Sequence, residues 1–246
     1  MKLRLLDLFS GIGGFSLGLE STGYFETIAF VEKNNFCQKV LQKNFPNIII
    51  ESEVRNVKGE KYKNTDVITA GFPCQPFSYA GRRKGTLDDR YLWDETIRIV
   101  KEVRPRWFIG ENTDGLIAIQ KGLVLKQVQT DLEKEGYEVQ CFVIPASAIG
   151  AWHNRKRVWI IANSKHNGLH NQKRDATIKS SNEPKEWLSI RNNWQKNKCE
   201  FLRINDGLST ELDKYRKERI KALGNSIVPQ IARQLGLAIM EAELNG

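Results

Sequence analysis

The strongest constraint on the fold is an alternation of short apolar runs, turns and amphipathic segments over the first 162 residues. Five apolar runs have the length and composition of buried strands: Leu3–Phe9, Thr27–Val31, Val67–Ala70, Trp107–Gly110 and Val139–Ile144. Helical spacing separates them, in a segment where Phe36, Val40 and Leu41 share a face and in the stretches Leu92–Val103 and Leu123–Glu135. This order predicts an α/β fold with a mostly parallel sheet covered on both faces. A further run, Arg157–Ala162, would close the sheet near an edge.

The sequence changes character after Asn163. Residues 164–222 hold 14 Lys and Arg against 8 Asp and Glu, which is +6 of the chain's net charge of +9. Trp187 and Trp194 stand among basic and amide side chains there. Two interpretations are open: a solvated, loosely ordered insertion, or a small module that faces nucleic acid with aromatic side chains between cations. Apolar periodicity returns at Ile227–Met240, which predicts a final helix.

Composition sets the broad class. Of 246 residues, 40% are hydrophobic and 27% charged, as in soluble globular proteins. No apolar run approaches the roughly 20 residues that span a bilayer, so no membrane association is expected. The N-terminus runs from Met1 into Asp7 without a small-residue cleavage site, so we expect a first strand and a cytoplasmic protein. The four cysteines form no Cys-x-x-Cys pair, and neither a metal site nor a disulfide framework is expected.

A glycine-rich stretch, Ser10–Gly14, follows the first expected strand. Glycines at such a turn let the backbone approach a ligand closely, as in nucleotide-binding turns between a strand and a helix. Glu32 ends the second expected strand, where a carboxylate can accept both hydroxyls of a ribose. An ordinary surface carboxylate explains Glu32 equally well on its own. Together the two features indicate a cofactor that contains adenosine, without identifying it.

Cys74 lies in a turn directly after the expected strand Val67–Ala70. Pro73, Pro76 and Gly71 predict a rigid turn at the carboxyl end of that strand, where open parallel sheets bind their ligands. A cysteine held there faces the cleft, and nearby cations or helix N-termini can lower its pKa enough to give a thiolate nucleophile. The pattern therefore favours a reactive Cys74 over a buried apolar one.

Five segments resemble the motifs of the DNA cytosine-5 methyltransferase family, in the family's order: DLFSGIGGF at 7–15, GFPCQPFS at 71–78, Glu111-Asn112-Thr113, His153-Asn154-Arg155-Lys156-Arg157 and Gly224-Asn225-Ser226-Ile227-Val228-Pro229. The resemblance implies a Rossmann-like, S-adenosylmethionine-dependent methyltransferase domain with a small, irregular target-recognition module. The pattern departs from the family at His153, usually Gln, and at Thr113, usually Val. Residues 164–222 are also short for a recognition region, and the penultimate motif has no clear counterpart.

The resemblance implies a role for each residue at the reacting base. Cys74 would add to C6 of cytosine, Glu111 would hold the ring N3, and Arg155 and Arg157 would steady O2 and the covalent adduct. A helix cap or surface ion pair is the alternative for Glu111, and simple phosphate contact the alternative for the arginines. The sequence does not identify the base that removes the C5 proton.

On the cofactor side, the resemblance assigns the ribose to Glu32 and, less firmly, the adenine to Glu53, which is one methylene longer than the family's aspartate. The other residues assigned to S-adenosylmethionine and its product S-adenosylhomocysteine are Phe9, Gly11, Ile12, Gly14, Val54, Pro73, Leu92, Asn225 and Ser226. Contact with DNA is expected from Gln75, Ser78, Arg82, Arg83, Lys84, Trp187 and Trp194. The stretch 78–92 matches a family loop that closes over DNA, although a disordered surface loop is the plain alternative.

The resulting prediction is an enzyme that methylates C5 of a flipped-out cytosine in a short duplex DNA sequence. Its segments would be a catalytic and cofactor-binding domain at 1–163, a small basic recognition region at 164–218, and a C-terminal segment at 219–246 that returns to the first domain. We expect a monomer that serves a restriction-modification system beside a cognate endonuclease, with an orphan or phage-borne enzyme equally open. The alternatives are a tRNA or RNA cytosine-5 methyltransferase and a catalytically silent DNA-binding relative.

Overall fold

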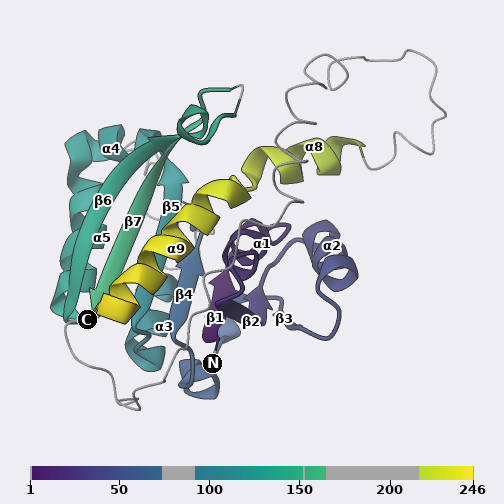
Figure 1. Ribbon diagram of the computed structural model, residues 1–246, viewed down its shortest axis with the longest axis horizontal. Coiled ribbons are helices and arrows are strands. Elements are labelled where there is room, and N and C mark those ends of the chain that lie inside the picture. The colour runs from purple at the N-terminus through teal and green to yellow at the C-terminus, as the bar shows by residue number, and fades with distance from the viewer. Residues whose placement is uncertain (1, 74–91, 152, 165–215, 246) are drawn as a thin grey trace, which may run out of the picture.

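The computed structural model describes residues 2–73, 92–151, 153–164 and 216–245 (Figure 1). They form one seven-stranded sheet with the order β3-β2-β1-β4-β5-β7-β6. The pairs β1–β2, β1–β4, β2–β3 and β4–β5 are parallel, whereas β7 is antiparallel to both of its neighbours. The predicted α/β class with a mostly parallel sheet is confirmed.

The strands are β1 (Leu3–Leu8), β2 (Phe25–Val31), β3 (Ile49–Glu51), β4 (Val67–Ala70), β5 (Trp107–Thr113), β6 (Tyr137–Pro145) and β7 (Lys156–Ser164). The five predicted apolar runs coincide with β1, β2, β4, β5 and β6. The run at Arg157–Ala162 is β7, but it lies one strand inside the edge, between β5 and β6. Because Val158, Trp159 and Ile160 are buried on both faces, this segment fills an interior position, and the more exposed β6 forms the edge.

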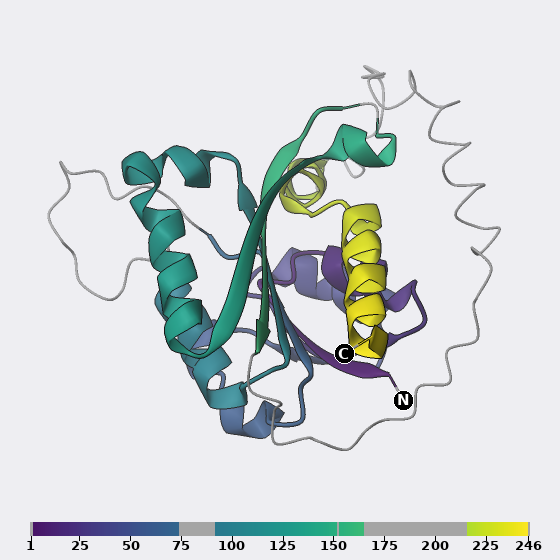
Figure 2. The same cartoon turned by 60° about the vertical axis from the view of Figure 1, so that its left-hand side comes forward.

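The helices are α1 (Gly14–Glu20), α2 (Asn35–Asn44), η1 (Val54–Asn56), η2 (Gly59–Tyr62), α3 (Trp93–Val103), α4 (Gly115–Ala118), η3 (Ile119–Gly122), α5 (Leu123–Lys134), η4 (Ala146–Ile149), α8 (Arg216–Asn225) and α9 (Pro229–Asn245). The views in Figures 1 and 2 place α3 and α5 on one face of the sheet and α1 and α9 on the other. Each face has its own core of buried side chains. Within the described ranges, no helix is long and apolar enough to cross a membrane.

The final helix packs closely on the first one. A Cβ built on Gly18 of α1 would lie 2.2 Å from the carbonyl oxygen of Pro229 and 2.8 Å from Cβ of Ala232, so only glycine permits this approach. At the other end of α9, the Glu243 carboxylate accepts a hydrogen bond from Trp107 Nε1 at 2.7 Å and pairs with Arg106. The C-terminal segment is therefore part of the layer that covers β1, β4 and β5.

Candidate active site

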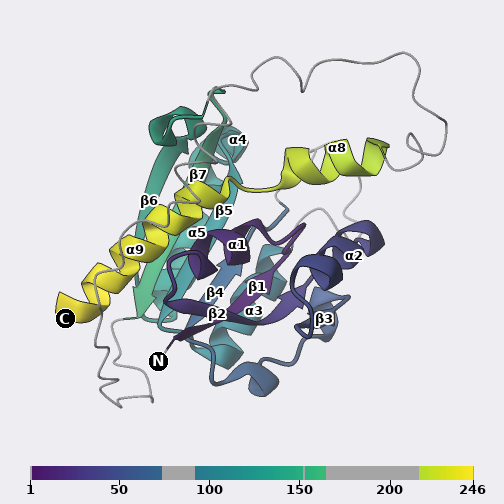
Figure 3. The same cartoon turned by 45° about the vertical axis from the view of Figure 1, so that its right-hand side comes forward.

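The strand order reverses between β1 and β4, whose last residues Leu8 and Ala70 lie side by side. In open α/β sheets, ligands bind at the carboxyl ends of the strands next to such a reversal. The glycine-rich turn follows β1, the segment that leads to Cys74 follows β4, and Glu111 stands near the carboxyl end of β5. Figure 3 shows this upper edge of the sheet, with the junction of α8 and α9 above α1. All the described candidate residues therefore come from one edge of the sheet or from the segments beside it.

The glycine-rich turn has a backbone that few sequences tolerate. Phe9, Gly11 and Gly13 have φ of 54°, 54° and 84°, in the left-handed region. The side chain of Ser10 fixes the turn, because its Oγ donates to the carbonyl of Asp7 at 2.6 Å and accepts from the amide of Val31 at 3.2 Å. A Cβ built on Gly11 would meet no atom within 4 Å among the described residues, so the backbone there faces open space. This arrangement suits a cradle for a ligand.

Glu32 connects the end of β2 to this turn. Its Oε2 accepts from the amide of Gly11 at 2.7 Å and its Oε1 from the amide of Asn34 at 2.7 Å. Burial raises the pKa of Glu32, while these backbone amides act in the opposite direction. Two carboxylate oxygens offer about four lone-pair directions, so acceptors remain for the two hydroxyls of a ribose. The donors and acceptors of Glu32 and the turn therefore fit an adenosine-containing cofactor.

The other residues assigned to the cofactor lie in different surroundings. The Glu53 carboxylate is 3.5 Å from Lys33 Nζ and 3.6 Å from Arg55 Nη1, and it accepts weakly from the amide of Arg55 at 3.4 Å. Val54 is buried in the core on the α3 face, and Leu92 packs against that core while partly exposed. An adenine contact by Glu53 would thus occur beside two cations, a setting that the sequence pattern did not suggest.

Glu111 is a buried carboxyl group on β5, 7% exposed, and Arg157 Nε lies 2.9 Å from its Oε1. Burial raises the pKa of Glu111, and the charges of Arg157 and Arg155 oppose that rise. A carboxyl group with a raised pKa retains its proton closer to neutral pH and can donate it to a ligand. Because Glu111 lies inside a buried strand, neither a helix cap nor a surface ion pair describes it.

The backbone that leads to Cys74 passes between Glu111 and the glycine-rich turn. A Cβ built on Gly71 would lie 3.9 Å from Glu111 Oε2 and 3.9 Å from the carbonyl oxygen of Phe9. The buried amide of Asn112 donates to the carbonyl of Phe72 at 2.8 Å and so ties this backbone to β5. Sequence reasoning gave Asn112 no role of its own, although a polar residue at the end of a buried strand needs a partner.

Arg155 and the last motif meet on the opposite side of the turn. Arg155 Nη1 donates to the carbonyl of Gly224 in the last turn of α8. Ser226 Oγ would lie 2.9 Å and Ile227 Cγ1 2.8 Å from a Cβ built on Gly14, so Ser226 and Ile227 pack closely on the glycine-rich turn. Burial and the charge of Arg157 lower the pKa of Arg155. Arg155 thus contacts the helix end that precedes Ser226, and Ser226 contacts Gly14, whereas Asn225 is exposed.

Several predicted residues lie outside the described residues: Cys74, Gln75, Ser78, Arg82, Arg83, Lys84, Trp187 and Trp194. Their roles remain predictions. Pro73 is the last described residue before Cys74, and it follows the anchored carbonyl of Phe72.

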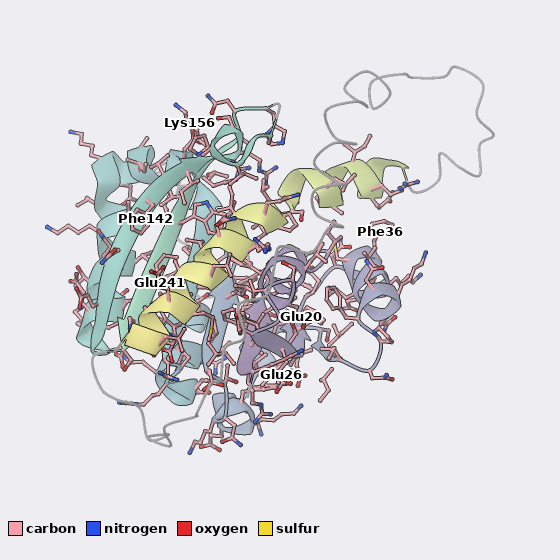
Figure 4. The ribbon with its side chains drawn as sticks, in the orientation of Figure 1. Glu20, Glu26, Phe36, Phe142, Lys156 and Glu241 are labelled. Atoms are coloured by element: carbon pink, nitrogen blue, oxygen red, sulfur yellow. The ribbon has the colours of Figure 1, made fainter. Side chains whose placement is uncertain are left out.

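A separate groove of about 410 Å³ lies between β6, β7 and α9. Its lining includes Trp107, Gln140, Phe142 and Leu235. Figure 4 labels Phe142 on the edge strand β6. Because Trp107 begins β5, the groove extends toward the amino end of that strand and does not belong to the carboxyl-edge site.

Comparison with known proteins identifies the family. The family model described as C-5 cytosine-specific DNA methylase matches residues 3–219. The type II methyltransferase M.Bsp6I of Bacillus sp. (strain RFL6) is 30% identical over 246 residues, which cover 95% of this chain and 78% of that relative. A putative DNA modification methyltransferase encoded within an E. coli prophage has a TM-score of 0.56 at 28% identity, over 67% of this chain and 47% of that one. DNMT2 of Spodoptera frugiperda, at 23% identity and a TM-score of 0.61 over 74% and 57%, shares the fold.

The mostly parallel sheet defines a Rossmann-like domain, and the family model makes it a methyltransferase domain. Because the family model spans most of the chain and M.Bsp6I aligns with nearly all of it, the chain belongs to the C-5 cytosine-specific DNA methylase family, whose members are DNA cytosine-5 methyltransferases. The chain spans about half the length of the two solved structures and most of M.Bsp6I. The predicted family is confirmed.

Proposed function

We propose that this protein transfers a methyl group from S-adenosylmethionine to C5 of a cytosine in a short duplex DNA sequence, through a covalent bond between Cys74 and C6. One observation carries the proposal: the buried Glu111, paired with Arg157, lies beside the backbone that leads to Cys74, with the glycine-rich turn on the other side. A buried acid and a nucleotide-type cradle on either side of this backbone support the proposal, in which Cys74 comes next along the chain. The family description, which specifies DNA, favours DNA over tRNA as the substrate.

The residues around the target cytosine have complementary tasks. C5 of cytosine is a poor nucleophile, and it becomes one when a thiolate adds at C6. The Cys74 thiolate forms this bond, and Glu111 in its protonated form donates to N3, so that negative charge does not build up on the ring. Arg157, already beside Glu111, supplies a permanent positive charge for O2. The raised pKa of Glu111 suits this task because the acid must be protonated near neutral pH.

The residues at the cofactor orient the methyl donor. When bound, S-adenosylmethionine supplies an electrophilic methyl group on its sulfonium. Glu32 accepts the ribose hydroxyls and also fixes the amide of Gly11, which keeps the turn in its left-handed conformation. After C5 has taken the methyl group, its proton leaves to a base and the bond between C6 and Cys74 breaks, so the thiolate and the aromatic ring are restored. The sequence does not identify that base.

Access to the base requires the cytosine to leave the duplex, at a cost of a few kcal/mol. We propose that Arg82, Arg83 and Lys84 contact phosphates near the flipped base, with Gln75 and Ser78 closer to it, and that Trp187 and Trp194 belong to the small recognition region. In this proposal the segments 1–163 and 219–246 form the catalytic body, and a cytoplasmic monomer binds one duplex. A cognate restriction endonuclease would complete a restriction-modification system, as the type II name of M.Bsp6I suggests.

A methyl-transfer assay with labelled S-adenosylmethionine tests the proposal. Wild-type protein should label duplex DNA and not tRNA, and Cys74→Ala should transfer nothing while binding S-adenosylhomocysteine as the wild type does. Duplex DNA with 5-fluorocytosine should form a covalent complex that requires Cys74, because fluorine blocks the final elimination. Label in tRNA alone would support the RNA enzyme, and no label in either substrate with normal DNA binding would support the silent relative.

A further inference from the structure

Arg155 meets the C-terminal end of α8. The last carbonyl groups of a helix have no partner within the helix, and they form the negative end of its dipole. Arg155 Nη1 donates to one of them, the carbonyl of Gly224. A guanidinium in this position neutralises the helix end and satisfies an otherwise unpaired acceptor. The contact spans 69 positions of sequence, so it links two separate parts of the chain.

The carbonyl that Arg155 holds belongs to the segment that presses on the glycine-rich turn. Ser226 continues directly from α8, because its amide donates to the carbonyl of Ala222 at 2.9 Å. Its Oγ and Cγ1 of Ile227 would lie 2.9 and 2.8 Å from a Cβ built on Gly14. Any outward shift of Gly224 therefore moves Ser226 away from Gly14 and widens the proposed cofactor cradle.

Arg155 is itself well placed to act as an anchor. Its own carbonyl accepts from the amide of Ala146 at 3.0 Å, which fixes its backbone to the start of η4. Two residues further along the chain, in β7, Arg157 pairs with Glu111. The two arginines thus contact different partners. Arg157 pairs with Glu111, the proposed acid at the cytosine, and Arg155 contacts Gly224, in the segment beside the glycine-rich turn.

We propose that Arg155 is a positioning residue for the cofactor site: by capping α8 at Gly224 it holds Ser226 against the glycine-rich turn and so sets the affinity for S-adenosylmethionine before DNA binds. The inference rests on the proposed function for the identity of that ligand. It differs from the role that the family resemblance implies for Arg155, which is contact with the cytosine. The two roles predict different measurements.

Calorimetric titration with S-adenosylhomocysteine, in the absence of DNA, separates the two roles. Arg155→Met removes the donors and should weaken binding about tenfold or more, which corresponds to about 1.4 kcal/mol. Arg155→Lys retains one cationic donor and should recover part of the loss. The matched control, Arg157→Met, removes the neighbouring guanidinium, which pairs with Glu111, and should bind the ligand within about twofold of the wild type.

Steady-state methyl transfer gives the second readout. For Arg155→Met, KM for S-adenosylmethionine should rise by the same factor as the dissociation constant, and kcat at saturating cofactor should fall much less. For Arg157→Met, kcat should fall and the cofactor KM should not rise. If Arg155→Met does not fold, Arg155→Lys gives the same comparison at smaller amplitude.

The outcomes are distinct. Unchanged ligand affinity in both Arg155 variants would overturn the inference, and a loss of kcat alone would place Arg155 at the base while the proposed function stands. Failure of the folded wild-type chain to bind S-adenosylhomocysteine would instead overturn the proposed function. A selective loss of ligand affinity in the Arg155 variants, with recovery by lysine, supports the inference.

Discussion

At the scale of single residues, the position of Glu111 on a buried strand determines the acidity of its carboxyl group. Its place on β5 buries the carboxyl group, and burial is the largest cause of its raised pKa. Arg157 at 2.9 Å limits the rise and holds the side chain in position. In the proposed function the same guanidinium faces O2 of the cytosine, and the pair would serve both binding and proton donation.

Replacing Glu111 with Gln tests the acid directly. The amide can donate a hydrogen bond but cannot give up a proton, so single-turnover methyl transfer should fall by about 10²–10⁴-fold. Because Glu111 acts when protonated, the wild-type rate should decline as pH rises through its raised pKa, and that decline should be missing in the variant. Rapid-quench measurements with labelled cofactor over a pH series give both results. Equal rates for the two proteins would remove Glu111 from the mechanism.

Asp7 predicts a different pH effect, on stability. It is fully buried beneath the glycine-rich turn, where Thr69 Oγ1 donates at 2.7 Å and Ser16 Oγ at 3.1 Å, and burial raises its pKa to about 7. An unfolded chain loses this proton near pH 4, so between about pH 4 and pH 7 the native state binds the extra proton. The contribution of Asp7 to stability is therefore complete below that window and is lost as pH rises through it.

A comparison of the wild type with Asp7→Asn tests the direction in which stability changes with pH. The wild type should gain stability relative to the variant by a few kcal/mol when pH is lowered from about 8 to about 5, because only Asp7 takes up a proton. Urea unfolding at several pH values measures the difference in free energy of unfolding. Parallel pH dependences for the two proteins would show that Asp7 does not titrate in this range.

Some of these residues were predictable from the sequence and others were not. Glu32 and Glu111 follow apolar runs that become β2 and β5, so their place at the carboxyl edge could be predicted before any contact was known. The roles of Asn112 and of the Arg155 side chain depend on partners 40 and 69 positions away. Spacing along the chain carries no information about which carbonyl such a donor reaches.

At the scale of elements, apolar runs predicted strands well because the interior strands are buried on both faces. β4, with four buried residues, was predicted with its observed bounds. β3 was not predicted, since it is an edge strand of three residues that are partly or fully exposed. α8 was not predicted either, because its sequence RKERIKALGN is mostly polar and its apolar residues Ile220 and Leu223 are exposed. The position of β7 inside the edge depends on strand order, which periodicity does not specify.

The crossing of α1 and α9 gives a prediction for packing. Gly18→Ala places a methyl group 2.2 Å from a backbone oxygen of α9, and a backbone atom cannot turn aside as a flexible side chain can. The helices must separate, at a cost of about 1–3 kcal/mol. Leu17→Ala, on the exposed face of the same helix, should change stability far less. Thermal or urea unfolding of both variants measures the loss in free energy of unfolding. An equal loss in the two variants would show that the close crossing does not matter for stability.

At the scale of the whole molecule, the site is assembled from segments that lie far apart in the sequence. The glycine-rich turn comes from the first strand, Glu111 and Arg157 from the middle of the chain, and Ser226 from its last part. They meet because parallel strands end at one edge and because α9 returns across α1, where Glu243 fixes it to Trp107. The basic stretch 164–222 stands between Arg157 and Ser226 in sequence, so the proposed recognition region would be attached to both halves of the site.

The charge of the molecule predicts how salt should affect its two ligands. Each phosphate contact releases counterions, so the logarithm of the DNA-binding constant should fall with the logarithm of salt concentration by about 0.9 per contact. Alanine at Arg82, Arg83 and Lys84 should reduce the slope by up to about 2.7 if all three meet phosphates. Binding of S-adenosylhomocysteine should depend little on salt, because the proposed contacts, Glu32 and the backbone of the turn, involve no phosphate.

A matched control removes the same charge elsewhere. Lys58, Lys61 and Lys63 are exposed in and next to η2, which leads into the amino end of β4, and Lys61 pairs with Glu51. Alanine at these three positions should leave the salt slope of DNA binding unchanged, although the net charge falls equally. Fluorescence anisotropy with a labelled duplex over a salt series measures both slopes. If the two triple variants lowered the slope equally, general attraction by the positive molecule would explain DNA binding, and the predicted loop contacts would be wrong.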